Sequence, residues 1–177
     1  MKKNVFYKIN VKQGDITKEK IDAIVNAANP SLLGGGGVDG AIHSAAGPEL
    51  LKECATLGGC LTGEAKTTAA YLLPTKFVIH TVGPVWQGGK NDEDSLLKNA
   101  YTNSLKEAVR VGAKSVAFPA ISTGVYGFPH ERAAKIAVQT IAAFLEKNNE
   151  IDEVRLICFT RESKDLLEKV LIELKNG

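Results

Sequence analysis

Cysteine is scarce in this chain of 177 residues, and its three copies are unevenly placed. Cys54, Cys60 and Cys158 form no Cys-x-x-Cys pair, and no histidine stands near the first two in the sequence. Their odd number argues against a disulfide framework, and their spacing argues against a zinc site. We therefore expect three reduced and mostly buried thiols in a reducing compartment, with no metal ion.

Long apolar stretches and an excess of charge of either sign are lacking too. No run approaches about 18 apolar residues, so no transmembrane helix is expected. Lys2 and Lys3 resemble the start of a signal peptide, but charged and polar residues interrupt the segment that follows. The formal net charge is +2, which argues against a nucleic-acid partner. These absences predict a cytoplasmic protein with no membrane partner, and the lack of an extended apolar surface stripe favours a monomer.

What the chain does contain is a regular alternation of strand-like and helix-like segments. Apolar residues make up 44% and charged residues 24% of the chain, and the length suits one domain spanning residues 1–177. Strands are expected at residues 6–11, 23–25, 66–71, 76–82, 115–119 and 153–159. A short turn or helix is expected at residues 18–20, and helices at residues 41–46, 48–56, 94–111, 130–147 and 163–174.

Several of the expected strands are apolar throughout, which is typical of parallel strands buried on both faces. The pattern therefore predicts an α/β fold, a three-layer α/β/α sandwich with a mixed, largely parallel central sheet. The first strand and the Thr-rich strand at residues 66–71 are the candidates to run antiparallel. Ser163 is the expected N-cap of the last helix.

The segment from Asn26 to Gly47 is the most unusual part of the chain. Between a short apolar strand and a helix it holds two asparagines, a proline, four consecutive glycines at residues 34–37 and one aspartate. Ordering a glycine costs more backbone entropy than ordering any other residue, so this run suggests a backbone that approaches a ligand closely. As a bare pattern it matches neither the dinucleotide fingerprint nor the P-loop.

A second glycine-containing loop, Ser122–Gly127, lies between an expected strand and the helix that begins near His130. Main-chain N–H groups at such a helix N-terminus form a ready phosphate site. The alternative is a tight turn in which Gly124 and Gly127 adopt positive φ. Because loops that follow parallel strands gather at one edge of the sheet, both glycine-containing loops should border one composite cleft.

Asp39 is the only acidic residue in the long loop, and it lies at the start of the next helix. The helix dipole would keep it ionised, so it could orient a water molecule but deprotonate it only weakly. Its alternative role is a helix cap. His43 lies four residues later on the same helix face and could bond to Asp39 or to the ligand, or pack half-buried against the sheet.

Other polar and aromatic residues near strand ends have two readings each. Asn26 and Asn29 could hold ribose hydroxyls or close the turn before the proline. Asp15 could accept a hydrogen bond from a base or form a turn, and Phe159 could stack on a base or belong to the core. Tyr126 could wall the cleft or fill it.

Four further residues have no expected part in the chemistry. His80 is expected in the core, Trp86 in packing, Phe128 beside the cleft or filling it, and His130 without a role. No Ser-His-Asp or Cys-His pairing has supporting spacing.

The order and spacing of four motifs resemble those of the macrodomains, specifically the MacroD-type branch, over nearly the whole chain. The motifs are Gly14-Asp-Ile-Thr17, Val25-Asn-Ala-Ala-Asn29, Gly34-Gly-Gly-Gly-Val-Asp-Gly-Ala-Ile-His43 and Ile121-Ser-Thr-Gly-Val-Tyr-Gly-Phe-Pro129. The resemblance implies a mixed sheet between helices and ADP-ribose as the ligand, without a cofactor. The zinc-dependent macrodomain branch is a poor match, because the segment from Gly34 to His43 carries no Cys/His ligand set.

The resemblance also implies an activity, the hydrolysis of an ester on the distal ribose. The implied reactions are deacetylation of O-acetyl-ADP-ribose and removal of mono-ADP-ribose from acidic side chains, so ADP-ribosylated proteins are implied partners. Carried over by position, the implied catalytic residues are Asp39, Asn29 and His43. The implied ligand-binding residues are Asp15, Ile16, Asn26, Gly36, Gly37, Val38, Ser122, Thr123, Gly124, Val125, Tyr126 and Phe159.

Since Asp39 alone is a weak base, the mechanistic hypothesis is that Asp39 and a phosphate oxygen of the ligand together activate the attacking water. Asn29 would fix the ribose. A non-catalytic reader of ADP-ribosylated proteins would not need Asp39 together with Asn29, so their joint presence favours an enzyme. A phosphatase acting on ADP-ribose 1″-phosphate would need the same pocket, and the sequence leaves that alternative open.

Overall fold

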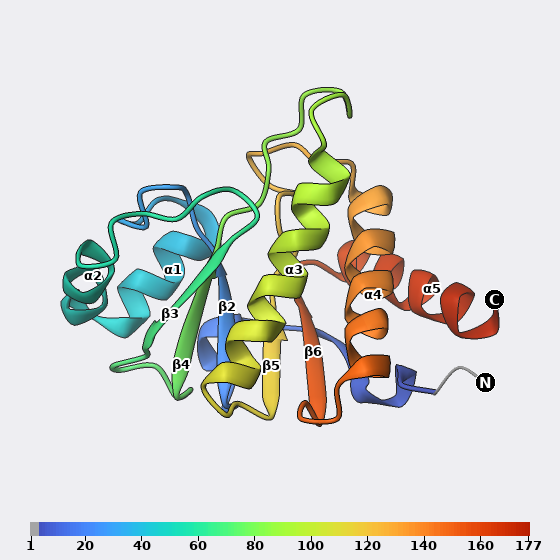
Figure 1. The fold of residues 1–177 in the computed structure, drawn as a ribbon, viewed down its shortest axis with the longest axis horizontal. Coiled ribbons are helices and arrows are strands. Elements are labelled where there is room, and N and C mark those ends of the chain that lie inside the picture. Colours follow the sequence, from blue (N-terminus) through green and yellow to red (C-terminus); the bar gives the residue numbers. More distant parts are fainter. Residues whose placement is uncertain (1–3) are drawn as a thin grey trace.

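The computed structural model describes residues 4–177, and its centre is a six-stranded sheet with the order β1-β6-β5-β2-β4-β3 (Figure 1). Every neighbouring pair is parallel except the edge pair β3 and β4, which is antiparallel. This confirms the predicted mixed, largely parallel sheet. The strands are β1 (Ile9–Gln13), β2 (Ala23–Ala27), β3 (Ala65–Ala69), β4 (Phe77–Thr81), β5 (Ser115–Phe118) and β6 (Glu153–Cys158).

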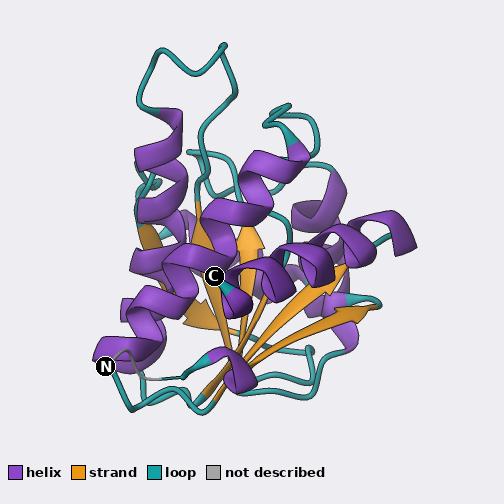
Figure 2. Cartoon of the chain, turned by 90° about the vertical axis from the view of Figure 1, so that its right-hand side faces the viewer, coloured by secondary structure: helices purple, strands orange, loops and turns teal. Residues whose placement is uncertain are grey.

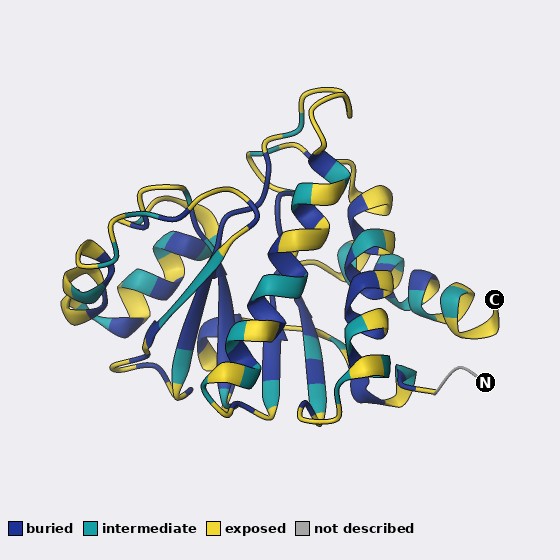
Figure 3. Cartoon of the chain, viewed as in Figure 1, coloured by how far each residue is buried: buried dark blue, intermediate teal, exposed yellow. Residues whose placement is uncertain are grey.

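Helices cover both faces of the sheet, and Figure 2 shows the strands fanning out between them. One apolar cluster packs α3, α4 and α5 against one face, and a second packs α1 and α2 against the other. The inner strands β2, β4 and β5 are almost wholly buried between these clusters, whereas the edge strands β1 and β3 are partly exposed (Figure 3). The helices are α1 (Gly37–Ala46), α2 (Pro48–Ala55), α3 (Glu93–Arg110), α4 (His130–Lys147) and α5 (Arg161–Asn176), with two short 3-10 helices, η1 (Phe6–Lys8) and η2 (Ile16–Lys18).

The first strand differs from its prediction in start and in direction. Residues 6–8 form η1, so the strand begins at Ile9, and Lys8 in this turn donates through Nζ to the carbonyl of Ile151. β1 runs parallel to β6, with Ile9 opposite Val154. The connection at residues 14–22 returns the chain to the amino-terminal edge of the sheet before β2 begins, so β1 and β2 point the same way. Only β3 of the two candidates runs antiparallel.

Two helix starts also differ from their predictions. α1 begins at Gly37 rather than at residue 41, so most of its first turn is made of the glycine motif. α5 begins at Arg161, and its N-cap is Thr160, whose hydroxyl accepts from the Ser163 main-chain N–H at 3.2 Å. Ser163 is therefore inside the helix and not its cap.

The chain connections diverge where β2 and β5 lie side by side. From β2 the chain passes through α1 and α2 towards β3 and β4, whereas from β5 it passes through α4 to β6 on the opposite face. Such a switch point opens a crevice beyond the carboxyl ends of the two strands, which is where open α/β sheets bind their ligands.

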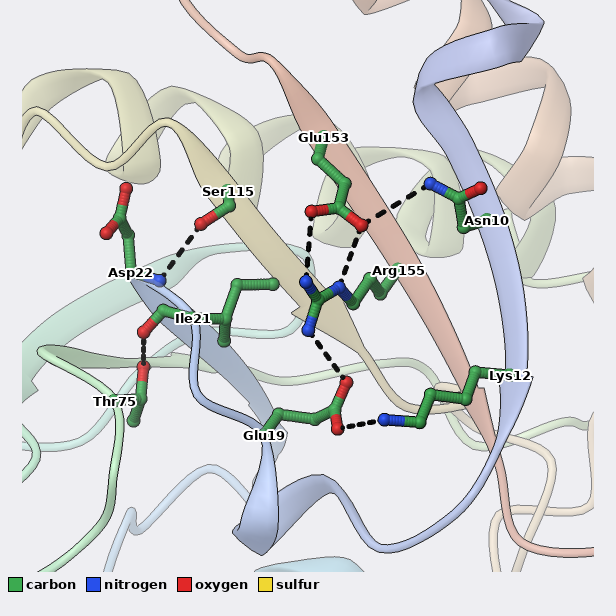
Figure 4. Close-up of polar contacts among 9 residues, drawn as sticks. All are labelled: Asn10, Lys12, Glu19, Ile21, Asp22, Thr75, Ser115, Glu153 and Arg155. Carbon is green, nitrogen blue, oxygen red and sulfur yellow. Dashed lines mark hydrogen bonds and ion pairs between the residues drawn. The ribbon is translucent and has the colours of Figure 1, made fainter.

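The segment between β1 and β2 is anchored by charged contacts across β1 and β6 (Figure 4). The buried carboxylate of Glu19 accepts from Lys12 Nζ at 2.7 Å and from Arg155 Nη1 at 3.3 Å. Arg155 in turn donates through Nε to Glu153 at 2.8 Å. These contacts fix the segment that carries Asp15 beside the carboxyl ends of the neighbouring strands. Across residues 4–177, no helix is both long enough and apolar enough to span a membrane.

Candidate functional site

Two loops border the crevice at the switch point. The glycine loop (residues 28–36) follows β2 and leads into α1, and the Thr-Gly loop (residues 119–129) follows β5 and leads into α4. Both lie at the upper edge of the sheet in Figure 1. Because β2 and β5 are adjacent and parallel, the two loops follow neighbouring strands at the same edge of the sheet, and that they close on one ligand stays a prediction.

Both loops present unpaired main-chain donors. Within residues 4–177, no acceptor is bonded to the main-chain N–H groups of residues 122–126, nor to those of residues 34–39. Consecutive unpaired N–H groups form an anion site, and for residues 34–39 the dipole of α1, which begins at Gly37, adds to the attraction. Two such rows after neighbouring strands suit a ligand with two negative groups in series, such as a diphosphate.

The backbone favours glycine inside the first row and directly after it. Gly37 has φ +59°, a conformation that other residues rarely adopt. A Cβ on Gly40 would lie 2.5 Å from the Gly35 carbonyl oxygen, so the first turn of α1 and the glycine loop touch there with no room for a side chain. Gly36 and Val38 complete the turn that presents the N–H groups.

In the Thr-Gly loop the strain lies on a serine. Ser122 has φ +68°, although it is not a glycine, and its buried Oγ has no hydrogen-bond partner in residues 4–177. Of the two glycines predicted at positive φ, only Gly127 adopts it, at +71°. Gly83 packs so closely against the Ser122 side chain that a Cβ there would overlap it. Strain of this kind persists only where the surroundings impose it, and it concentrates at functional sites.

Asp39 presents one oxygen to the protein and leaves the other free. The residue is 4% exposed, and its Oδ1 accepts from Asn26 Nδ2 at 2.8 Å. Its Oδ2 accepts no hydrogen bond in residues 4–177 and borders Gly35, where a Cβ would lie 3.1 Å away. Asp39 is inside the first turn of α1, and Gly36 is the N-cap without a side-chain bond, so the alternative role of Asp39 as a cap is wrong.

His43 lies beside Asp39, as the helical spacing predicted. Its Nε2 is 3.4 Å from Asp39 Oδ1 but makes no hydrogen bond with it and is sealed from solvent. In residues 4–177, no group of three or more His, Cys, Asp or Glu side chains could hold a metal ion. The arrangement therefore offers a carboxylate and an imidazole, held against each other at the base of α1.

The two asparagines are placed differently. Asn29 closes the glycine loop: its Nδ2 donates to the Gly34 carbonyl at 2.9 Å, and its Oδ1 accepts from the Ser31 hydroxyl at 2.6 Å. The turn-closing reading therefore holds for Asn29, and contact with a ribose stays a prediction. Asn26 is wholly buried, with its amide on Asp39, so in this structure it presents no surface to a ligand.

The residues predicted for the base lie together at the ends of β1 and β6. The main-chain N–H of Gly14 donates to the Cys158 carbonyl at 3.0 Å, which joins the two loops. Phe159 is 91% exposed, so it is not a core residue, and the Ile16 side chain is buried. Side-chain and main-chain hydrogen bonds from Thr17 lower the pKa of Asp15 below its ordinary value, so Asp15 is both an exposed carboxylate and the cap of η2.

The aromatic residues after β5 separate into an inner and an outer one. Phe128 is buried and packs against Trp86, with ring centroids 4.8 Å apart, so it fills the fold. Tyr126 is half-buried, and its carbonyl accepts from the Trp86 N–H at 2.8 Å. Val125 is fully exposed at the tip of the loop. Tyr126 and Val125 are therefore available to line the cleft, whereas Phe128 is not.

A buried polar cluster behind Asp39 was missed by sequence reasoning. The ring of His80 on β4 contacts Asn26, Thr68 and Cys54, at 3.1, 2.9 and 3.7 Å. Asn26 and His80 are register partners in adjacent strands, and only knowledge of that pairing could have joined them. Burial lowers the pKa of His80 to about 3, and His43 adds to the shift. Burial also raises the pKa of Cys54 to about 11, so its unexpected pairing with histidine does not make it a nucleophile.

Comparison with known proteins agrees with this geometry. A family model described as Macro domain matches residues 25–137. A Macro domain-containing protein of Methanosarcina mazei is 58% identical over 167 residues, which cover 94% of this chain and 89% of that protein. A protein of Escherichia coli strain K12 named O-acetyl-ADP-ribose deacetylase is 54% identical over 170 residues, 94% of this chain and 96% of that protein.

A similar solved structure carries the expected type of ligand. A mutant of the Oceanobacillus iheyensis macrodomain, solved with ADPR, superposes with a TM-score of 0.93 at 44% identity, covering 100% of this chain and 99% of that one. The two chains therefore share one fold over their whole length.

Proposed function

This chain belongs to the Macro domain family, and from that premise we propose that it binds ADP-ribose and hydrolyses esters on the distal ribose. The substrates we propose are O-acetyl-ADP-ribose and proteins that carry mono-ADP-ribose on acidic side chains. The observation that carries the proposal is the pair of unpaired N–H rows at the switch point, one of which ends beside the free oxygen of Asp39. The name of the Escherichia coli relative and the ligand of the Oceanobacillus iheyensis structure support it.

Binding follows from the order of the loops along the sheet edge. With the diphosphate on the two N–H rows, we propose that the adenine points towards β6 and β1, where Asp15 and the exposed ring of Phe159 lie. Stacking of a base on an aromatic ring contributes about 1–3 kcal/mol. The distal ribose then extends towards the glycine loop, where Asn29 and Asp39 flank Gly35.

The proposed reaction is attack by water on the acyl carbon of the ester. Asp39 Oδ2 and a phosphate oxygen of the bound ligand position the water and share its proton, because one carboxylate alone is a weak base at neutral pH. The water oxygen bonds to the acyl carbon and the bond from that carbon to the ribose oxygen breaks. One water proton ends on the ribose hydroxyl, and the acid formed releases the other. Fixing the diphosphate thus orients the reacting end.

A non-catalytic reader is the rival function, and one feature favours the enzyme. A reader needs the two N–H rows and the base contacts, but it has no use for a nearly buried carboxylate whose Oδ1 is tied back by Asn26 while Oδ2 stays free. Along with the enzyme we propose a monomer that acts in the cytoplasm on free and protein-bound esters.

The test compares wild type with Asp39→Ala on O-acetyl-ADP-ribose and on a glutamate-ADP-ribosylated protein. Turnover should fall by about 10²–10⁴ in the variant. The Kd for ADP-ribose, measured by calorimetry, should change only a few-fold, because the N–H rows are untouched. Asp152→Ala, which alters an exposed carboxylate far from the crevice, is the matched control and should behave as wild type.

Three results would count against the proposal. Wild-type turnover in Asp39→Ala would remove the catalytic role of the carboxylate. Tight binding of ADP-ribose by a wild type that hydrolyses neither ester would leave the reader as the function. Absence of heat with ADP-ribose would contradict the ligand itself.

A further inference from the structure

A chain of buried hydrogen bonds runs from Asp39 across three strands. Asp39 Oδ1 accepts from Asn26 on β2, whose Nδ2 is also 3.1 Å from Nδ1 of His80 on β4. The opposite ring nitrogen of His80 is 2.9 Å from Thr68 Oγ1 on β3, and this hydroxyl donates to the Ala69 carbonyl at 3.0 Å. Asn26, His80 and Thr68 are all buried, so no water competes for these bonds.

The chemistry of its two ends fixes the direction of every bond in this chain. The ionised carboxylate of Asp39 can only accept, so Asn26 must present its Nδ2 there. The second hydrogen of the same Nδ2 then faces His80, so Nδ1 of the ring must be the acceptor. The ring proton therefore lies on Nε2. Nε2–H donates a hydrogen bond to Thr68 Oγ1, and the Thr68 hydroxyl donates to the Ala69 carbonyl. All the donors and acceptors match in this one arrangement.

We infer that Asn26 and His80 are positioning residues, which hold the Asp39 carboxylate with Oδ1 inward and Oδ2 towards the crevice. The inference rests on the proposed function, which gives the orientation of Asp39 its purpose. The Oδ1 of Asn26 has no partner in residues 4–177. The orientation of the amide therefore depends on the two bonds made by Nδ2, to Asp39 and to His80. If the proton of His80 moved to Nδ1, two donors would face each other, and the amide would have to turn its oxygen towards the carboxylate.

The surroundings keep His80 in the neutral form that this arrangement requires. The ring has no accessible surface, and the groups around it are Asn26, Thr68, the Cys54 thiol and the ring of His43, whose centroid is 6.3 Å away. No carboxylate bonds to the His80 ring in residues 4–177, so nothing there stabilises a second ring proton. Thr68 and its carbonyl partner therefore select between the two neutral tautomers.

The first test measures the tautomer in the wild-type protein and needs no activity. Nitrogen-15 NMR of the histidine ring should show His80 with its proton on Nε2 from about pH 5 to pH 8. A proton on Nδ1, or a mixture of both tautomers, would overturn the inference. Asn26→Leu should lose the hydrogen-bonded signature at Nδ1.

The second test separates positioning from packing through kinetics. Asn26→Leu should lower kcat by about 10–100-fold, because a misplaced catalytic group costs this much. His80→Asn keeps an acceptor near the Nδ1 position and should stay within about threefold of wild type, whereas His80→Gln, which cannot place an acceptor there, should lose about tenfold. The Kd for ADP-ribose should remain within about threefold throughout, since the N–H rows are unchanged.

A matched pair of variants at Thr68 tests the far end of this series of hydrogen bonds. Thr68→Val removes the acceptor for Nε2–H and should lower kcat by about threefold to tenfold, and Thr68→Ser should restore it. Thr67→Val is the control, because this neighbouring hydroxyl donates to Glu107 instead, at 2.8 Å, and kcat should not change. Melting temperatures of all variants show whether a loss of kcat is a loss of fold.

The outcomes distinguish the inference from the function on which it rests. Wild-type kcat in Asn26→Leu, or equal losses in His80→Asn and His80→Gln, would overturn the positioning role while the enzyme stands. A wild type that hydrolyses neither ester would overturn the proposed function and the positioning role with it. An Nε2 tautomer together with the graded losses in kcat at constant Kd supports the inference.

Discussion

The glycine loop and the Thr-Gly loop make a natural comparison, because both follow parallel strands, lead into helices and present unpaired N–H groups to one crevice. Behind the glycine loop lie polar side chains, with Asp39 bonded to Asn26 and Asn26 bonded to His80. Within residues 4–177, no such series of side-chain hydrogen bonds lies behind the Thr-Gly loop. The main features of that loop are the strained backbone of Ser122 and the exposed tip at Val125. Under the proposed function, the glycine loop serves both a reactive group and an anion, whereas the Thr-Gly loop serves an anion alone.

The two loops also draw support from different places. Asp39, directly after the glycine loop, is supported from within the sheet, through β2, β4 and β3. The Thr-Gly loop is supported from outside, by the segment after β4: Trp86 bonds to Tyr126, packs on Phe128 and carries Arg132 over its ring at 5.1 Å. From this difference we expect changes in the glycine loop to act mainly on kcat, and changes in the Thr-Gly loop mainly on the Kd for ADP-ribose.

The largest effect that would test the comparison is expected from Gly40→Ala. The new Cβ would lie 2.5 Å from the Gly35 carbonyl oxygen, so Gly35, which Asp39 and Asn29 flank, must shift relative to α1. A displacement of about 1 Å at the reacting groups should lower kcat by roughly 100-fold, with a smaller change in the Kd for ADP-ribose. Steady-state kinetics and calorimetry on the same preparation give both numbers.

The control for this change is Ser44→Ala, which alters an exposed position on the same helix and should leave kcat at the wild-type value. A Gly40→Ala variant with full kcat would show that the glycine loop tolerates displacement. The assignment of chemistry to that loop would then be wrong.

The next effect is expected from Gly124→Val in the Thr-Gly loop. Gly124 does not have positive φ, and a Cβ there would meet no atom within 4 Å, so the fold should accept the side chain. Its branched methyl groups would stand over the N–H row and weaken ADP-ribose binding by about 10–100-fold, whereas kcat at saturation should stay within about threefold. Calorimetry and saturation kinetics check the two halves of this prediction, and Gly124→Ala should give an intermediate Kd. An unchanged Kd would remove this loop from the diphosphate site.

The smallest effect concerns the outside support and its dependence on pH. Burial of the Glu93 carboxylate works against ionisation, but main-chain N–H donors from Gln87, Asn91 and Gly89 outweigh it and lower the pKa of Glu93 to about 2, from an ordinary value of 4.5. A lowered pKa means that Glu93 stabilises the fold above about pH 4.5, and that this contribution disappears as the pH falls towards 2.

Melting temperatures of wild type and Glu93→Gln should therefore differ most at about pH 7 and converge near pH 2. The Kd for ADP-ribose should rise in Glu93→Gln while kcat holds, because Glu93 anchors residues 87–91, part of the segment after β4 that supports the Thr-Gly loop. A difference in melting temperature that grows as the pH falls would contradict the prediction.

Particular residues show how far sequence reasoning reached. The alternation of apolar strands and helices predicted the sheet, and strand-end motifs predicted which loops lie at its carboxyl edge, because parallel strands send their carboxyl ends to one edge. The neighbourhood of Asp39 and His43 followed from helical spacing. The same reasoning placed residues 6–8 in the first strand and began α1 four residues late, because local propensity accounts neither for the bond from Lys8 to Ile151 nor for the tight contact between Gly40 and Gly35.

The sequence by itself determined the elements, the glycines that the backbone requires and the family to which the motifs point, since these depend on residues close together in the chain. Only the tertiary structure decided which oxygen of Asp39 is free and what holds the other. That decision depends on Asn26, His80 and Thr68, which lie up to 54 residues apart along the chain and meet because β2, β4 and β3 are neighbours in the sheet. Hydrogen bonds require contacts of about 3 Å, and the register between strands, which no local pattern records, is what supplies them.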